Sequence, residues 1–101
     1  MADYIGTDLK FLVEPSAAGF VKTRDEFEVV ITRGSVEKKF YKSELAVDEQ
    51  DNYYVCFSSE EFGAGQYYIT IITHTPDEDF DDGFREDVKQ YPLVNIQKTK
   101  K

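Results

Sequence analysis

The chain has 101 residues, 15% of them aromatic, and a formal net charge of −8. This length fits one domain, and eight Phe and seven Tyr supply the apolar area of a folded core. The negative charge disfavours binding to nucleic acid or to an anionic membrane, which both need a basic face. The single cysteine excludes an intrachain disulfide, and no signal peptide or membrane-spanning stretch is readable. We therefore expect one domain, residues 1–101, made in a reducing cytoplasm.

The first two predicted strands alternate apolar and polar residues with a period of two. In the segment DLKFLVEP, Leu9, Phe11 and Val13 share one face, and Pro15 ends the run. The segment DEFEVVITRG places three apolar side chains on one face, namely Phe27, Val29 and Ile31. No stretch shows a helical period over more than one turn, so the sequence predicts an all-β protein.

The remaining strands are predicted from shorter alternating runs separated by turn residues. They cover residues 36–41, 44–47, 53–58, 66–73 and 91–97. Pro92 cannot donate to a ladder, so the last strand is expected to start late or to lie at a sheet edge. An N-terminal arm (1–7) and a basic C-terminal tail (97–101) are expected to fray in isolation.

Seven short strands at this spacing indicate a β-sandwich. The segment SSEEFGAGQYYITI adds a local signal, because Ser58 and Glu61 are spaced as a capping box for one helical turn. The residues after that turn match a tyrosine corner, in which a buried ring ties down the crossing between sheets. Its predicted structural residues are Phe62, Gly63, Gly65 and Tyr67. The alternative is a partly buried strand tyrosine without a corner bond.

These features predict an immunoglobulin-like β-sandwich of about seven antiparallel strands. The chain departs from antibody-type domains, because it has no Trp and no cysteine pair. Ile69 stands where the second cysteine of such a domain would lie. The expected likeness is therefore to the architecture of the fold.

The acidic segment THTPDEDFDDGFRED does not match a calcium loop of the EF-hand type, which needs acids or amides at positions 1, 3 and 5 and Gly at position 6. A loop that starts at Asp77 has Asp82 at position 6, and one that starts at Glu78 has Phe80 at position 3. A looser calcium site stays open as an alternative. We predict no metal site and no cofactor.

Catalysis is not predicted either. Carboxylates on a loop between two sandwich strands are expected to be hydrated and ionised, whereas acid–base pairs need a partly dry pocket. Cys56 lies mid-strand and is expected to be packed, and His74 is expected at the surface near a strand end. One His and one Cys supply too few ligands for zinc, and the glycines match no nucleotide-binding motif.

The acidic segment is instead the candidate protein-binding element. Residues 77–87 contain seven acids and one arginine, a net charge of 1 − 7 = −6. The candidate binding residues are Asp77, Glu78, Asp79, Phe80, Asp81, Asp82, Phe84 and Arg85. In one interpretation the two phenylalanine rings fold back over the open end of the sandwich. In the other they anchor a basic partner.

Four segments carry a resemblance to a known family: DLKFLVEPSAAGF, DEFEVVITRGS, DEQDNYYVCF and EFGAGQYY. Together they resemble small virion proteins of tailed bacteriophages of gut Bacteroidetes, including the crAss-like group. The resemblance spans about residues 8–72, so it implies nothing about the acidic segment.

The resemblance implies an immunoglobulin-like structural module, most simply an auxiliary or decoration protein on the capsid. Its partners would be other virion proteins, either the major capsid protein or a tail protein. It would be a monomer in isolation and present in many copies on the particle, after synthesis in the bacterial host cytoplasm. Two alternatives stay open: an acidic inhibitor of a basic protein, and a carbohydrate-binding adhesion module, which the seven tyrosines suggest.

Overall fold

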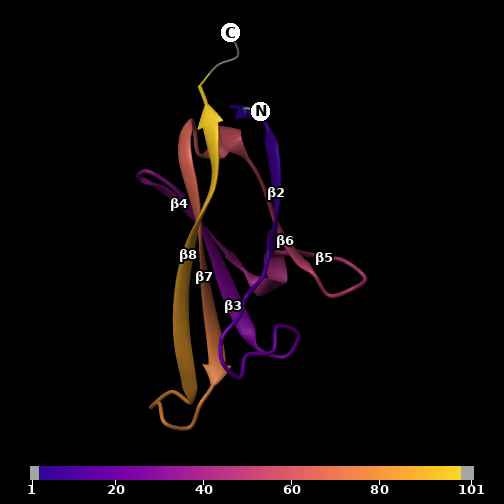
Figure 1. The fold of residues 1–101 in the computed structure, drawn as a ribbon, viewed down its shortest axis with the longest axis vertical. Helices are drawn as coiled ribbons and strands as arrows, with labels where there is room; N and C mark the ends of the chain where they lie inside the picture. The colour runs from indigo at the N-terminus through magenta and orange to yellow at the C-terminus, as the bar shows by residue number, and fades with distance from the viewer. Residues whose placement is uncertain (1–2, 99–101) are drawn as a thin grey trace.

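The computed structural model describes residues 3–98, which form two β-sheets packed face to face (Figure 1). The strands are β1 (Asp3–Tyr4), β2 (Asp8–Val13), β3 (Glu26–Arg33), β4 (Val36–Tyr41), β5 (Ala46–Val47), β6 (Tyr53–Ser58), β7 (Gly65–Pro76) and β8 (Phe84–Gln97). Two short 3-10 turns, η1 (Lys42–Glu44) and η2 (Ser59–Glu61), complete the fold. Within residues 3–98 there is no α-helix.

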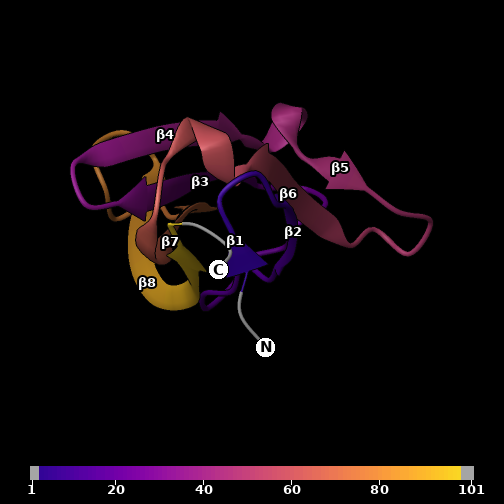
Figure 2. The ribbon, with the colours of Figure 1, turned by 90° about the horizontal axis from the view of Figure 1, so that it is seen from above.

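One sheet has the order β1-β8-β7-β3-β4 and the other the order β2-β6-β5. All neighbouring strands are antiparallel except β1, which runs parallel to β8. Strands β2, β6 and β5 occupy the places of strands B, E and D of an immunoglobulin domain, and β3, β4, β7 and β8 occupy those of C, C′, F and G. The predicted all-β, immunoglobulin-like sandwich is confirmed. Figure 2 shows the two layers from above.

The seventh strand is longer than predicted. It starts at Phe84 and spans fourteen residues, and β7 continues to Pro76. Pro92 lies within β8, beside a bulge at which Leu93 and Val94 together face Tyr67. On its other side β8 pairs only with β1, at residues 96–97. The expectation of an edge position is therefore confirmed, and that of a late start is wrong.

The predicted N-terminal arm forms more hydrogen bonds with the rest of the fold than expected. Residues 3–4 form β1, and Ile5 N donates to Gln97 O over 3.0 Å. Gly6 N donates to Ser59 Oγ over 2.8 Å, and Ser59 N donates to Thr7 O over 3.0 Å. Fraying is thus wrong for residues 3–7, because the turn after β6 supplies their hydrogen-bond partners. Residues 1–2 and 99–101 lie outside the described part of the chain. The predicted strand at 44–47 shortens to Ala46–Val47, because Glu44 belongs to η1.

The core lies between the two sheets and is rich in aromatic side chains. Val55 on β6 and Val29, Ile31 and Phe27 on β3 are fully or almost fully buried. The ring of Phe57 lies at its centre and contacts four other rings, with centroid separations of 5.2 Å (Phe62), 6.0 Å (Phe11), 6.1 Å (Tyr67) and 6.4 Å (Phe40). The alternation predicted for the first two strands thus places the expected faces in the core.

The tyrosine corner is confirmed. The hydroxyl of Tyr67, a fully buried residue, donates to Gly63 O over 2.6 Å and lies 3.2 Å from Ser59 O. Phe62 packs beneath it at 2% exposure. Gly63 and Gly65 have φ values of +92° and +133°, which side chains rarely adopt. A Cβ at Gly65 would also lie 2.9 Å from Arg33 Cδ.

The helical turn predicted before this corner is confirmed as η2, which has Ser58 as its N-cap. The Ser58 side chain accepts from Glu60 N rather than from Glu61 N. The Glu61 carboxylate lies instead 3.3 Å from Lys38 Nζ on β4. The cap therefore forms, and the second acid of the predicted box instead makes an ion pair between η2 and β4.

Asp25 closes the turn that leads into β3. Its carboxylate accepts from Arg24 Nε over 2.7 Å and from Val21 N over 2.9 Å, and its side chain is almost fully buried. The hydrogen bond from the Arg24 guanidinium lowers the pKa of Asp25 below its usual range, and the Val21 amide and the charge of Lys42 act in the same direction. The ionised carboxylate therefore favours the folded state.

Asp25→Asn is expected to lower the free energy of unfolding at pH 7. Because the folded pKa is depressed, the contribution of the charge is present above the unfolded pKa, about 3.9, and is lost as the pH falls through the folded value. Urea unfolding between pH 7 and pH 2 should therefore show that the difference in free energy of unfolding between the variant and the wild type narrows below about pH 4. Glu26→Gln, at an exposed neighbouring acid, is the control. If that difference in free energy of unfolding stayed the same down to pH 2, the stabilising role of the Asp25 charge would be contradicted.

Candidate protein-binding hairpin

The acidic segment forms the tip and base of the β7–β8 hairpin. Asp77 N donates to Gly83 O over 2.8 Å, which closes the loop of residues 77–83. Inside the loop, Gly83 N donates to Phe80 O over 2.9 Å, and Gly83 takes a φ of +81°. These bonds give the loop a defined shape. The loop lies at one end of the long axis of the molecule (Figure 1).

Two of the acids help to fold the loop. The Asp77 carboxylate accepts from Asp79 N over 3.0 Å, and the Asp82 carboxylate accepts from Phe84 N over the same distance. Such side-chain-to-backbone bonds are typical of aspartate in turns. The carboxylate oxygens of these two residues stabilise the loop backbone, and the residues also contribute negative charge to the loop.

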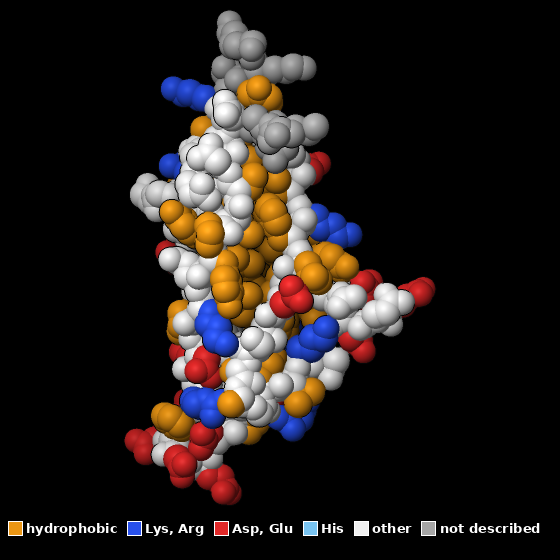
Figure 3. Space-filling model, viewed as in Figure 1, with side chains coloured by type: hydrophobic (Ala, Val, Ile, Leu, Met, Phe, Trp, Pro, Cys, Tyr) orange, Lys and Arg blue, Asp and Glu red, His pale blue; other side chains and the backbone are white. Residues whose placement is uncertain are grey.

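The two phenylalanine rings lie at the surface. Phe80 and Phe84 are each 47% exposed, and neither belongs to the buried core cluster. The interpretation in which both rings cover the open end of the sandwich is therefore not observed. Four exposed acids lie next to the rings in the sequence, namely Glu78, Asp79, Asp81 and Asp82. Figure 3 shows acidic side chains gathered at this end of the molecule.

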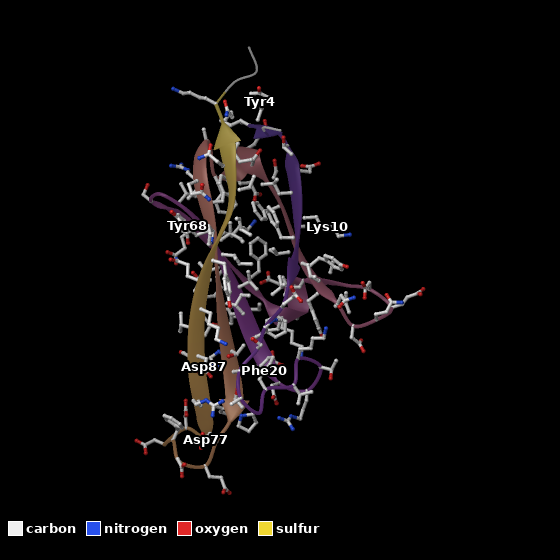
Figure 4. All side chains as sticks on the ribbon, viewed as in Figure 1. Tyr4, Lys10, Phe20, Tyr68, Asp77 and Asp87 are labelled. Atoms are coloured by element: carbon white, nitrogen blue, oxygen red, sulfur yellow. The ribbon has the colours of Figure 1, made fainter. Side chains whose placement is uncertain are left out.

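Arg85 holds the base of the hairpin rather than its tip. Its guanidinium pairs with the Asp77 carboxylate at 3.4 Å and the Asp87 carboxylate at 3.2 Å, and it donates to Ala18 O in the loop between β2 and β3. Lys89 Nζ donates to Ser16 O of the same loop over 2.8 Å. Figure 4 shows Asp77 and Asp87 at the lower end of the hairpin. Of the predicted binding residues, Arg85 and Asp77 are thus partly used to position the hairpin.

The described residues contain no metal-binding cluster, and the single cysteine and the single histidine lie on different strands. Within 3–98, no group of three or more His, Cys, Asp or Glu side chains is placed to hold a metal ion. Cys56 is exposed on β6, so the expectation that it is packed is wrong. His74 lies on the outer face of β7, with Nε2 3.7 Å from Glu28 Oε1. These two residues belong to different sheets, and their side chains point away from the shared core.

An apolar groove between β2 and β8 was not predicted. It has a volume of about 340 Å³ and is lined by Leu12, Glu14, Ile69, Ile71, Tyr91 and Leu93. The sequence signal for it is Leu12, which falls on the polar phase of the β2 alternation and is 46% exposed. Leu12 contributes to the edge of the sandwich rather than to its core.

Comparison with known proteins gives no relative: no family model, no curated protein and no solved structure matches this chain. Within residues 3–98, no helix has the length and apolar character needed to cross a membrane.

Proposed function

We propose that this protein is a non-enzymatic structural protein of a bacteriophage virion, an auxiliary or decoration subunit on the capsid. It attaches to a basic surface of another virion protein through the β7–β8 hairpin. The observation that supports this best is the pair of half-exposed rings, Phe80 and Phe84, within a segment of net charge −6. Aromatic anchors surrounded by charge are typical of binding surfaces.

The fold suits this role. A sandwich is a rigid block, and its hairpin holds the anchors in a defined geometry before contact, which lowers the entropic cost of binding. Many copies on one shell also make weak single contacts effective. The surface acids keep unassembled copies soluble in the host cytoplasm. The virion assignment itself comes from the resemblance of residues 8–72 to phage virion proteins.

Neutralising the tip of the hairpin is expected to weaken attachment. In the triple variant Asp79→Asn, Asp81→Asn, Asp82→Asn the amide oxygens can still accept the loop hydrogen bonds, while three charges are lost. Each exposed interfacial charge contributes about 0.2–1 kcal/mol, so we expect roughly tenfold weaker binding at low salt and a smaller difference at high salt. The measurement is the copy number of the protein on purified particles, with binding to isolated capsid protein at two salt concentrations.

A matched control removes the same charge elsewhere. Glu49→Gln, Asp51→Asn and Glu60→Gln change three exposed acids that lie outside the hairpin. This control should attach like the wild type. Purified particles that contain none of this chain would contradict the virion role, and equal loss in both triple variants would contradict the role of the hairpin.

The same hairpin also favours a second candidate, an acidic inhibitor that covers a basic site on one protein. It predicts a soluble 1:1 complex with salt-sensitive affinity and no incorporation into particles. The adhesion alternative has less support, since two of the seven tyrosines, Tyr53 and Tyr67, are buried in the core. A glycan array without hits would remove it.

A further inference from the structure

The groove between β2 and β8 marks an edge at which the sandwich is incompletely closed. Its floor is formed by Ile69 and Ile71 on β7, and its sides by Leu12 on β2 and Tyr91 on β8. Leu12 and Tyr91 are each 46% exposed, although both lie beside the core. Figure 3 shows apolar side chains gathered in a band along the middle of the face that it displays.

The edge of β8 is poorly suited to accept such a strand. Pro92 has no amide hydrogen, and the bulge at Leu93 and Val94 disturbs the spacing of the ladder. Below them, residues 85–90 carry charges along the edge, which also discourages pairing. Only residues 96–97, above the bulge, are paired, with β1.

The edge of β2 is more regular, although it also carries two exposed charged residues, Asp8 and Lys10. Its six residues pair with β6 in a continuous antiparallel register, without a bulge or a proline. Within residues 3–98, no strand lies on its other side. An unpaired regular edge beside an apolar groove is a template for strand addition.

The direction of the missing strand follows from β1. This strand runs parallel to β8, and the turn at Gly6 then reverses the chain into β2. A strand that lies in the groove in line with β1 therefore runs antiparallel to β2. Figure 2 shows β1 on the side of β8 that faces β2. The existing β1–β8 ladder is thus the beginning of a closure that stops after two residues.

We propose that the β2 edge accepts an extended segment of a partner protein, about six residues long, which adds antiparallel to residues 8–13 and closes the sandwich. The segment carries apolar side chains at every second position, which fill the groove over Ile69 and Ile71. Its first residue lies near Glu14, whose carboxylate favours a basic side chain there. The backbone hydrogen bonds supply affinity, and the alternating side chains supply specificity.

A second copy of this chain does not fit the groove through its own free edge. In that copy, the inward side chains of β2, Leu9 and Val13, are buried in its own core. Pairing of two β2 edges would therefore leave the groove unfilled. This inference goes beyond the proposed hairpin contact and does not depend on it, because the groove and residues 77–83 lie on different parts of the molecule.

The test attaches a probe strand in cis. An eight-residue segment of alternating Val and Thr is added directly before Asp3. It extends β1 in the N-terminal direction, along the groove. A second extension exchanges the Val and Thr positions, which turns every side chain to the opposite face. One phase should raise Tm by about 5 °C or more and slow amide exchange at alternate residues of β2, and the other should not.

Leu12→Glu should abolish the gain of the favourable extension, whereas Val47→Glu, at a similarly exposed residue of β5, should preserve it. The favourable sequence as a free peptide should bind the unextended protein 1:1 and should not bind the Leu12→Glu variant. Equal effects of both phases, no effect of either, or slowed exchange at β8 or β4 instead of β2 would overturn the proposal. So would a dimer of the unextended protein that Leu12→Glu dissociates, since the groove would then belong to a second copy.

Discussion

Phe57→Ala is expected to lower the free energy of unfolding by about 3–5 kcal/mol, the usual cost of deleting a buried phenylalanine ring. Phe57 is only 8% exposed and lies between the sheets, in contact with four other rings. The loss combines the transfer energy of the ring with the cavity that remains. Because a domain of this size is stable by roughly 5–15 kcal/mol, the variant is expected to unfold at much lower urea concentration or not to fold at all.

Urea denaturation followed by circular dichroism measures this effect, and the slope of the transition shows whether unfolding stays two-state. Phe80→Ala and Phe84→Ala are matched controls, because they delete the same ring at the exposed hairpin. Both should change stability by no more than about 0.5 kcal/mol. If Phe57→Ala were as mild as these controls, the aromatic cluster would not be the centre of the core.

Tyr67→Phe is expected to cost about 1–3 kcal/mol, although it removes a single oxygen atom. The lost hydroxyl leaves Gly63 O without its 2.6 Å donor in a partly buried turn. For a domain of about 100 residues, each kcal/mol corresponds to a fall in Tm of roughly 4–8 °C. Calorimetry of Tyr67→Phe beside Tyr68→Phe gives the comparison, since Tyr68 is the exposed neighbour on the same strand.

The pH dependence provides a second readout. Burial raises the pKa of Tyr67 above its usual value of 10.0. The folded state therefore holds this proton more tightly than the unfolded chain, and stability falls as the pH rises above about 10. Tyr67→Phe should weaken that alkaline loss, whereas Tyr68→Phe should keep it. An unchanged Tm and an unchanged alkaline slope in Tyr67→Phe would show that the corner bond does not stabilise the fold.

Much of the candidate hairpin could be read from the sequence, but its geometry could not. The density of acids and the presence of Phe80 and Phe84 identify a charged segment with apolar anchors. Whether the rings fold inward depends on how far β7 and β8 extend beyond the smaller sheet. Both strands continue to the loop at residues 77–83, so the rings end beyond the core. The pairing of Arg85 with the loop between β2 and β3 joins segments 67 residues apart, which no local pattern encodes.

The sequence by itself determined the elements whose signal is local. Alternation identified the strands that are buried on one face, because side chains of a strand point to opposite faces in turn. The Gly-x-Gly-x-Tyr spacing located the corner, because only glycine takes the positive φ values of that turn without strain. The charge and the single His and Cys are the basis of the prediction that the chain has no catalytic site.

Only the tertiary structure decided the features that depend on which strands pair or lie side by side. The lower half of β8 has no apolar alternation to read, because it lies at a sheet edge beyond the smaller sheet and none of its side chains is buried. The pairing of β1 with residues 96–97 and the groove beside Leu12 arise from segments at opposite ends of the chain. A pattern along one strand reports the face that the strand buries. It does not report which strand lies beside it, since backbone hydrogen bonds are the same for every sequence.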